Sequence, residues 1–413
     1  MFWANVIGMK TVTLLGAEAN RWIFAGENDY LVNRWSYGIR KLLGKRCLSL
    51  LDGEEHRERR RILAPHFRRI GMDPLVPLLV ETTQEHLRSW ANAGDIVVLP
   101  RMKALAFEIA ARYIFGDIRS LDLKTLSADF DDFVAGLFAP IPLPLPGTTF
   151  GRATAARKRL FREIARVVAE RTRQPDDGAD VLSTLLEVRD EQGRPLPEDT
   201  IVDELVLLLF AGHDTTVTAM TNVMLHLARH PEALTRAQAE QDALRDAPMT
   251  VASYRRMRYL ERVLNESMRV VPPIAGAFRV TTRDVAYAGY RIPKGWTVLV
   301  SMAGAAHDAE VWGEVESFDP DRFDEDSAPP RPPFSFIPFG GGPRACLGQH
   351  FAMLEMLVVI SRILRDYSFS LVPNQDLSYV YLPFPRPRSG VRLHLEPRRV
   401  PSRAPEPAIA GGQ

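Results

Sequence analysis

The stretch Phe339-Gly-Gly-Gly-Pro-Arg-Ala-Cys-Leu-Gly348 places one cysteine, Cys346, directly before a predicted helix. Three glycines and a proline force a tight, irregular backbone, so this segment is itself neither helix nor strand. A thiolate at this position gains from the unpaired N–H groups and the dipole of the helix N-terminus. Gly348 lets a flat ligand approach the backbone closely.

Three chemistries are open to Cys346. A thiolate suits a haem iron, because its sulfur donates electron density and favours cleavage of an O–O bond. A free cysteine is more commonly a small buried hydrophobe, and a catalytic nucleophile needs a histidine that sequence alone cannot place. The pattern Gly340-x-Gly342-x-x-Ala345 matches a relaxed dinucleotide fingerprint. It follows a proline-rich loop instead of a βαβ strand, so we reject it.

Around this stretch the sequence predicts a mainly helical protein with a small β portion. The longest helix begins at Pro197, with proline at its first position and acids in its first turn, and runs to about His230. Prolines exclude helix from 140–147, and a loop as long as 318–345 is expected to be either functional or disordered. The other expected helices cover 17–25, 53–63, 74–90, 107–115, 152–173, 257–271 and 347–365, and β structure is expected at 11–15 and 285–300.

The composition excludes several classes of protein. The 413 residues carry 52 Lys+Arg against 51 Asp+Glu, and this balance argues against nucleic acid as a partner. Two cysteines exclude a disulfide framework and an all-cysteine zinc site, which favours a reducing, cytoplasmic compartment. We see no signal peptide and no apolar run long enough for a transmembrane helix. Residues 398–413 are expected to be a disordered tail.

The cysteine stretch resembles the signature of the cytochrome P450 family. The pattern Phe-x-x-Gly-x-Arg-x-Cys-x-Gly falls on Phe339, Gly342, Arg344, Cys346 and Gly348. The resemblance covers about 12–395 and implies one prism-shaped domain, residues 1–397, with a long central helix over haem b (iron protoporphyrin IX). It also implies that Cys346 is the axial ligand, that Arg344 meets a haem propionate, and that Phe339 packs on the proximal side.

A second motif of the family is Glu266-x-x-Arg269. The i,i+3 spacing places both side chains on one helix face, although such a pair exposed on a surface contributes little to stability. The resemblance adds Arg322 as a third member. A buried Arg–Glu–Arg set risks a net desolvation cost, so we expect this network to fix the long loop that delivers Cys346.

The longest helix carries Ala211-Gly-His-Asp-Thr-Thr216, which contains poor helix formers. Read alone, this is a polar patch on an amphipathic helix. The resemblance assigns Asp214 and Thr215 to an acid–alcohol pair that relays protons toward bound oxygen. Ala211 and Gly212 would leave space above the iron, and we interpret His213 as lining or packing and not as an iron ligand.

A basic helix holds His56 and Arg60 at i,i+4 spacing, hence on one face. The resemblance places both at haem propionates, together with Arg279. The neighbouring arginines 57, 59 and 61 are then expected to be exposed. Two interpretations of them stay open: a solvated basic face, or a docking patch that steers an acidic electron-transfer partner.

The function implied by the resemblance is a monooxygenase that inserts one oxygen atom from O2 into a lipophilic substrate. The segments 144–150, 16–20 and 40–44 are similar to the branch of retinoic-acid hydroxylases and plant steroid oxidases, which suggests a retinoid, sterol, terpenoid or fatty-acid-like substrate. No flavin or nicotinamide domain follows Cys346, so electrons are expected from a separate ferredoxin, flavodoxin or reductase, and a monomer is expected. The candidate substrate contacts are Leu207, Phe210, Ala211, Ile274, Ala275 and Leu382.

Three alternative functions remain at this point. They are a peroxide-driven peroxygenase or rearrangement enzyme, a non-catalytic haem- or lipid-binding protein, and a cysteine-nucleophile enzyme without haem. The start of the chain also departs from the family, whose members have more residues before the first strand. The expectation is a naturally short or a truncated start, with membrane association through missing residues left open.

Overall fold

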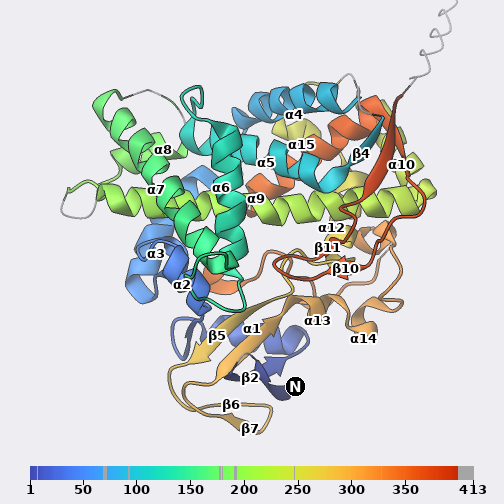
Figure 1. Ribbon diagram of the computed structural model, residues 1–413. Helices are drawn as coiled ribbons and strands as arrows, with labels where there is room; N and C mark the ends of the chain where they lie inside the picture. Colours follow the sequence, from blue (N-terminus) through green and yellow to red (C-terminus); the bar gives the residue numbers. More distant parts are fainter. Residues whose placement is uncertain are drawn as a thin grey trace, which may run out of the picture.

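The computed structural model describes residues 1–6, 8–67, 72–91, 94–175, 178, 180–189, 193–245, 247–326 and 328–398. Helices predominate with a minor β portion, as the sequence predicts (Figure 1). Within the described residues, no helix is both long enough and apolar enough to cross a membrane. The helices are α1 (Ala17–Gly26), α2 (Tyr37–Leu42), α3 (Gly53–Leu63), α4 (Leu75–Ala91), α5 (Val98–Phe115), α6 (Leu123–Leu137), α7 (Thr149–Arg173), α8 (Val181–Glu187), α9 (Glu198–Arg229), α10 (Pro231–Ala243), α11 (Val251–Tyr254), α12 (Arg258–Val270), α13 (Met302–Ala306), α14 (Ala309–Trp312) and α15 (Gln349–Asp366).

Helix α9 is the central element of the helical layer, and Figure 1 shows it crossing the whole width of the molecule. Pro197 is its N-cap and not its first helical residue, which corrects the predicted start by one position. The helix has 32 residues and packs against α5, α7, α12 and α15, so it is buried on nearly every side. A helix of this length in a globular protein is stable because its neighbours cover it.

A five-stranded sheet forms a separate lobe below the helices, with strand order β1-β2-β8-β5-β3. The β2–β8 pair is parallel and the other three pairs are antiparallel. Helix α1 packs on this sheet, and together they enclose a second, smaller core. The strands of this sheet are β1 (Phe2–Val6), β2 (Met9–Leu14), β3 (Leu31–Asn33), β5 (Gly276–Thr281) and β8 (Thr297–Ser301).

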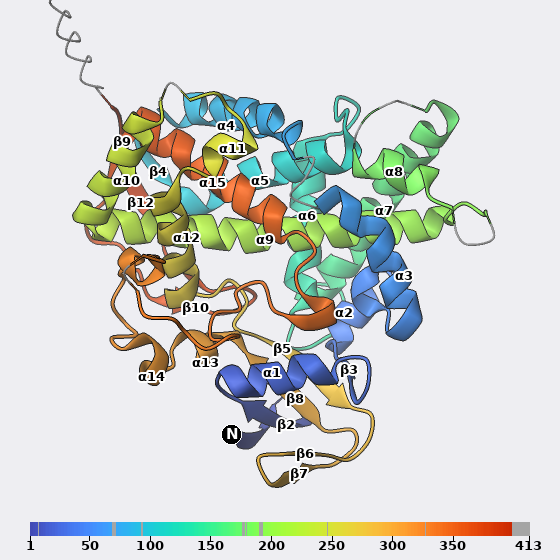
Figure 2. The same cartoon turned by 180° about the vertical axis from the view of Figure 1, so that it is seen from behind.

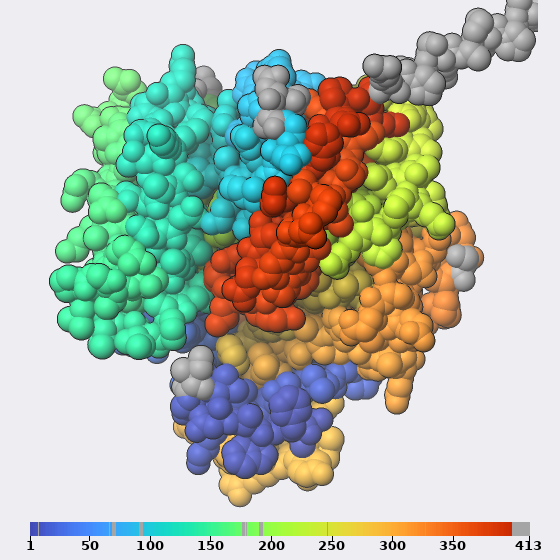
Figure 3. Space-filling view, turned by 45° about the vertical axis from the view of Figure 1, so that its right-hand side comes forward, coloured from blue at the N-terminus to red at the C-terminus, as the bar shows by residue number. Residues whose placement is uncertain are grey.

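The C-terminal strands cover one end of the helical layer. Figure 3 shows this red segment lying across the surface between the cyan and the yellow-green helices. Pro397 ends β12, and Arg398 forms an ion pair with Asp242 at 2.7 Å, so both are ordered; the rest of the expected tail lies outside the described residues. The remaining strands are β4 (Asp95–Val97), β6 (Val285–Tyr287), β7 (Tyr290–Ile292), β9 (Tyr367–Leu371), β10 (Tyr379–Val380), β11 (Arg386–Pro387) and β12 (Arg392–Pro397).

The predicted helices all exist, but several others were missed. Helix α5 begins nine residues earlier than the predicted 107, at Val98. Pro100 lies in its first turn, where proline costs no intrahelical hydrogen bond. Helices α2, α6, α8 and α10 were not predicted; α6 and α8 begin at N-capping aspartates, Asp122 and Asp180. An aspartate at each of these positions is a typical N-cap, and it could have indicated in the sequence that a helix begins there.

Candidate active site

The cysteine loop adopts the tight turn that its glycines and proline predict. Gly340 and Gly342 have φ angles of +70° and +64°, a region that strongly favours glycine. The backbone N–H of Cys346 donates to the carbonyl of Phe339 at 2.8 Å. Gly348 is the N-cap of α15, so Cys346 lies three residues before the first residue of that helix. Figure 2 shows this orange segment descending from the lower end of α15, below α9 and toward α2.

Burial and two nearby groups have opposite effects on the pKa of the Cys346 thiol. Cys346 is exposed to solvent by surface area, yet the surrounding protein atoms desolvate its thiol and raise its pKa. A thiol that faces an internal hollow is accessible to a solvent probe and is also surrounded by protein atoms, which accounts for both its exposure and its desolvation. The backbone N–H of Gly348 and the charge of Arg60 act in the opposite direction and favour the thiolate. An electrophilic metal at the sulfur would complete the shift to thiolate.

Helix α9 has one open position within its buried length. Ala211 is exposed and Gly212 is half-buried, whereas most residues of the helix on either side are buried. A Cβ placed on Gly212 would meet nothing within 4 Å. At Gly348 such a Cβ would meet only a ring carbon of Phe67, at 4.0 Å. Both glycines predicted to border a flat ligand therefore border open space.

The predicted acid–alcohol pair lies beside this opening. Asp214 is buried, and its Oδ2 has no hydrogen-bond partner among the described residues. Burial alone would raise the pKa of Asp214, but His213, Lys103 and Arg386 together lower it. The hydroxyl of Thr215 donates to the carbonyl of Ala211 at 2.8 Å. His213 is 1% exposed and packs away from solvent, in line with the interpretation as a packing residue.

The Glu266–Arg269 pair is fully buried, and it organises the loop that follows α14. Both carboxylate oxygens of Glu266 accept from Arg269, at 2.7 and 2.8 Å. Arg322 lies 3.5 Å from the same carboxylate. Arg269 also donates to the carbonyls of residues 306, 315 and 317, and the N–H of Asp319 donates to Glu266 at 2.9 Å. The network thus fixes backbone 306–319, upstream of the cysteine loop.

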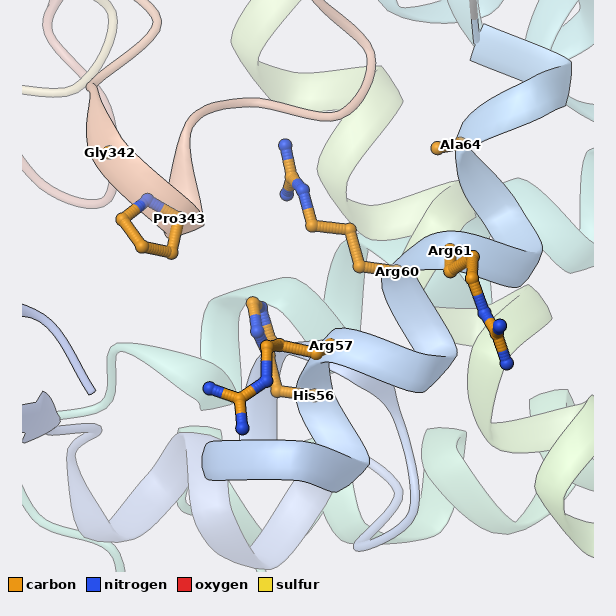
Figure 4. A pocket seen from close by; sticks show the side chains of 7 residues that line it. All are labelled: His56, Arg57, Arg60, Arg61, Ala64, Gly342 and Pro343. Carbon is orange, nitrogen blue, oxygen red and sulfur yellow. The ribbon is translucent and has the colours of Figure 1, made fainter.

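A cavity of about 390 Å³ separates α3 from the cysteine loop (Figure 4). Its lining consists of His56, Arg57, Arg60, Arg61, Ala64, Gly342 and Pro343. His56 is buried, its Nδ1 has no hydrogen-bond partner within the described part of the chain, and burial lowers its pKa to about 4. Arg60 reaches across and donates to the carbonyl of Ala345 at 2.7 Å. Arg344 donates to the carbonyl of Leu51 at 2.8 Å and pairs with Asp52.

Arg279, the fourth predicted propionate contact, is held by a carboxylate that sequence reasoning missed. Its Nε and Nη2 both donate to Oε1 of Glu27, at 2.7 and 2.5 Å. The other oxygen of Glu27 accepts the backbone N–H of Arg344 at 3.3 Å. Glu27 lies 252 residues from Arg279 and belongs to no motif, so no signal in the sequence joined them.

The predicted exposure of the basic residues on α3 is wrong for Arg59. Its side chain is only 15% exposed and pairs with the buried Glu204 of α9 at 2.6 Å. Glu204 also accepts from the backbone N–H of Leu48 at 3.1 Å. Burial raises the pKa of Glu204 to about 7. Arg57 and Arg61 are exposed as expected, so the basic face is narrower than predicted.

The candidate substrate contacts divide into three groups. Leu207 is buried in the core, whereas Leu382 is 69% exposed and Ala275 is exposed. Phe210 and Ile274 are half-buried. Sequence reasoning missed Phe138 and Phe384, whose rings contact one another at 5.6 Å, while Phe138 also contacts Phe210 at 6.3 Å. These three phenylalanines come from the end of α6, from α9 and from the β10–β11 connection, and Phe210 is the residue before Ala211 in α9.

A second missed residue is Glu355 of α15. It is buried, and burial raises its pKa to about 8, so it is mostly protonated at neutral pH. Its hydrogen-bond partner is Thr216, the residue after Thr215. Only the packing of α15 on α9 brings these two together.

The family model of cytochrome P450 matches residues 1–392 of the chain. The chain is a cytochrome P450. Cytochrome P450 120 of Synechocystis sp. (strain ATCC 27184 / PCC 6803 / Kazusa) is 35% identical over 397 residues, covering 96% of this chain and 89% of that protein. Protopanaxadiol 6-hydroxylase of Panax ginseng is 32% identical, with coverages of 96% and 84%.

A solved structure supports the same assignment. Retinoic acid-bound cyanobacterial CYP120A1 superposes with a TM-score of 0.92 at 35% identity, covering 96% of this chain and 91% of that one. The predicted P450 fold is thereby confirmed. As a P450 the chain is a monooxygenase that uses haem with a cysteine thiolate ligand and O2. The residues present fit this group: a thiol with nearby donors, two glycines bordering open space, and a buried histidine whose Nδ1 is unpartnered beside two arginines.

Proposed function

We propose that this P450 hydroxylates an extended lipophilic substrate of the retinoid, sterol or terpenoid class. The observation that carries the proposal is a group of three phenylalanines in ring contact, Phe138, Phe210 and Phe384, of which Phe210 immediately precedes the exposed Ala211. Aromatic side chains at a site contribute large apolar contact area. The solved relative binds retinoic acid, and the ginseng relative is named for protopanaxadiol; both names support this class.

The haem, when bound through Cys346, supplies the activation of O2. The residues of this chain supply the rest of the site. Asp214 contributes a buried carboxyl, and the hydroxyl of the next residue, Thr215, donates to the carbonyl of Ala211 at the open position of α9. We propose that this pair delivers the protons that O–O cleavage consumes. We also propose that His56, Arg60, Arg344 and Arg279 hold the haem propionates, and that electrons come from a separate donor protein.

Ligand-induced changes in the absorption spectrum test the substrate class. We expect retinoic acid, a sterol or a triterpene to shift the Soret band of the purified protein, and Phe210→Ala to weaken that binding. Losing a buried phenylalanine contact costs about 1.5–3 kcal/mol, which is about tenfold to hundredfold in affinity. Phe323→Ala is the control, because that ring packs on Trp312 and Phe336 of the loop region. No shift with any of the three ligands would refute the proposed class.

The ratio of product formed to O2 consumed tests the proton relay. We expect Asp214→Asn and Thr215→Ala to lower this ratio while O2 consumption continues. Thr218→Ala removes a buried threonine of the same helix and should leave the ratio unchanged. Wild-type coupling in both site variants would exclude the proposed roles of Asp214 and Thr215.

A further inference from the structure

The two ring nitrogens of His213 face two different groups. Nε2 lies 3.0 Å from the backbone carbonyl of Lys103 on α5. Nδ1 lies 3.4 Å from Oδ2 of Asp214 on its own helix, and neither of these two buried atoms has a hydrogen-bond partner among the described residues. Two aromatic rings hold the imidazole edge-on: Phe107 of α5 at 5.7 Å and Phe130 of α6 at 5.3 Å, with interplanar angles of 86° and 88°. The ring is thus fixed in place by three elements.

These contacts determine where the ring protons lie. A carbonyl oxygen only accepts, so Nε2 carries a hydrogen that it donates to Lys103. In a neutral ring Nδ1 is then an acceptor, and it faces a carboxylate oxygen that is also an acceptor. Two facing acceptors at this distance repel each other in a buried site. One proton, on Nδ1 or on Oδ2, turns the repulsion into attraction, so the pair binds that proton as a unit.

Few other charges reach this pair. Lys103 of α5 points its ammonium to Asp131 of α6, with which it forms an ion pair. Lys103 and Arg386 of β11 both act on Asp214 electrostatically. Both are cations, so both favour the ionised carboxylate. The imidazole of His213 lies 3.4 Å from Oδ2.

We propose that His213 is a positioning residue for Asp214, which it holds through one shared proton between Nδ1 and Oδ2. This inference rests on the proposed role of Asp214 in proton delivery. When the proton leaves Asp214 for the oxygen-binding side of α9, the Nδ1–Oδ2 contact becomes repulsive, which favours uptake of the next proton by the same pair. The Lys103 carbonyl and the two phenylalanines keep Nδ1 aimed at Asp214 throughout.

Three variants of the haem-loaded enzyme test the proposal. His213→Leu removes the shared proton site and keeps an apolar side chain between Phe107 and Phe130. His213→Gln keeps a donor for the Lys103 carbonyl but does not titrate. His226→Leu is the control, because His226 is also a buried histidine of α9, bonded through Nδ1 to Ser267 at 2.9 Å and remote from Asp214 in the helix.

We expect His213→Leu to lower the product-to-O2 ratio about tenfold, within the range of coupling between neighbouring residues. His213→Gln should keep the ratio at its plateau but shift its pH dependence by about one unit or more, because a lone carboxyl titrates differently from an imidazole–carboxyl pair. The His226 control should do neither. The double variant His213→Leu/Asp214→Asn should be no worse than Asp214→Asn alone, since the two residues act as one unit.

The protonation itself is read by ¹⁵N NMR of histidine-labelled, reduced, CO-bound protein. We expect Nε2 of His213 to be protonated, and Asp214→Asn to change the Nδ1 signal. If Asp214→Asn uncouples turnover but the His213 variants leave the pH profile and coupling at wild-type values, the role of His213 is refuted and that of Asp214 stands. If Asp214→Asn leaves coupling unchanged, the proposed relay fails, and the His213 role fails with it.

Discussion

Replacing Glu266 by glutamine tests whether the buried charge network supports the loop that precedes Cys346. The variant keeps the size of the side chain and removes its charge. Arg269 then stays fully buried with no carboxylate, because both side chains are 0% exposed. Arg322, 3.5 Å from the same carboxylate, loses this ion pair but keeps its hydrogen bonds to residues 312, 314 and 317. Removing one member of a buried ion pair typically costs about 3–5 kcal/mol, because the remaining charge is uncompensated.

This loss of unfolding free energy can be converted to a decrease in the melting temperature. An unfolding entropy of roughly 2.1 cal/mol/K per residue gives about 0.9 kcal/mol/K for 413 residues. The expected loss for Glu266→Gln is therefore about 3–6 °C. Glu163→Gln is a matched control: it also breaks an i,i+3 pair, with Arg166 at 2.6 Å, but Glu163 is 36% exposed. Such a pair contributes about 0–1 kcal/mol, or about 1 °C at most.

Circular dichroism melting of the haem-loaded protein is the assay. We expect Glu266→Gln to melt several degrees below Glu163→Gln. We also expect it to lose haem faster at about 37 °C. Equal melting temperatures for the two variants would refute it. In that case the buried network would contribute no more than a surface pair, and the loop would be held by its backbone contacts alone.

Three further outcomes follow from the structure. Cys346→Ala should abolish the red-shifted Soret band of the reduced, CO-treated protein, because it removes the sulfur that flanks the α15 N-terminus; an unchanged band would contradict the thiolate assignment. Gly212→Ala should raise the free energy of unfolding by about 0.5–1 kcal/mol in denaturant titrations, since a helical Cβ there meets nothing within 4 Å, while weakening binding of a lipophilic ligand; a destabilised variant would contradict the open space. The hydrogen bond to Asp95 raises the pKa of His394. The protonated His394 should therefore stabilise the pairing of β12 with β4 at low pH, and this stabilisation should be lost as the pH rises through the folded-state pKa. The melting temperatures of wild type and His394→Asn should differ more at about pH 5 than at about pH 9, and the reverse result would contradict this sign.

Sequence alone predicted the features that depend on residues close together in the chain. The cysteine loop follows from glycines and a proline in consecutive positions, and the Glu266–Arg269 pair follows from helical spacing. Helices α4 and α5 were predicted from their apolar periodicity, and the C-terminal ends of α3, α9 and α12 from the prolines that follow them. Such features are set by backbone geometry within a few residues, so they survive without knowledge of the fold.

Only the tertiary structure decided which distant side chains meet. Arg279 joins Glu27 across 252 residues, and Arg59 is drawn from the predicted exposed face onto Glu204 across 145 residues. The orientation of His213 depends on a backbone carbonyl 110 residues away, and the burial of Glu355 depends on the packing of α15 on α9. A buried charge or imidazole must take a partner wherever packing supplies one, and helix packing and strand order, not local spacing, determine which partner is within reach.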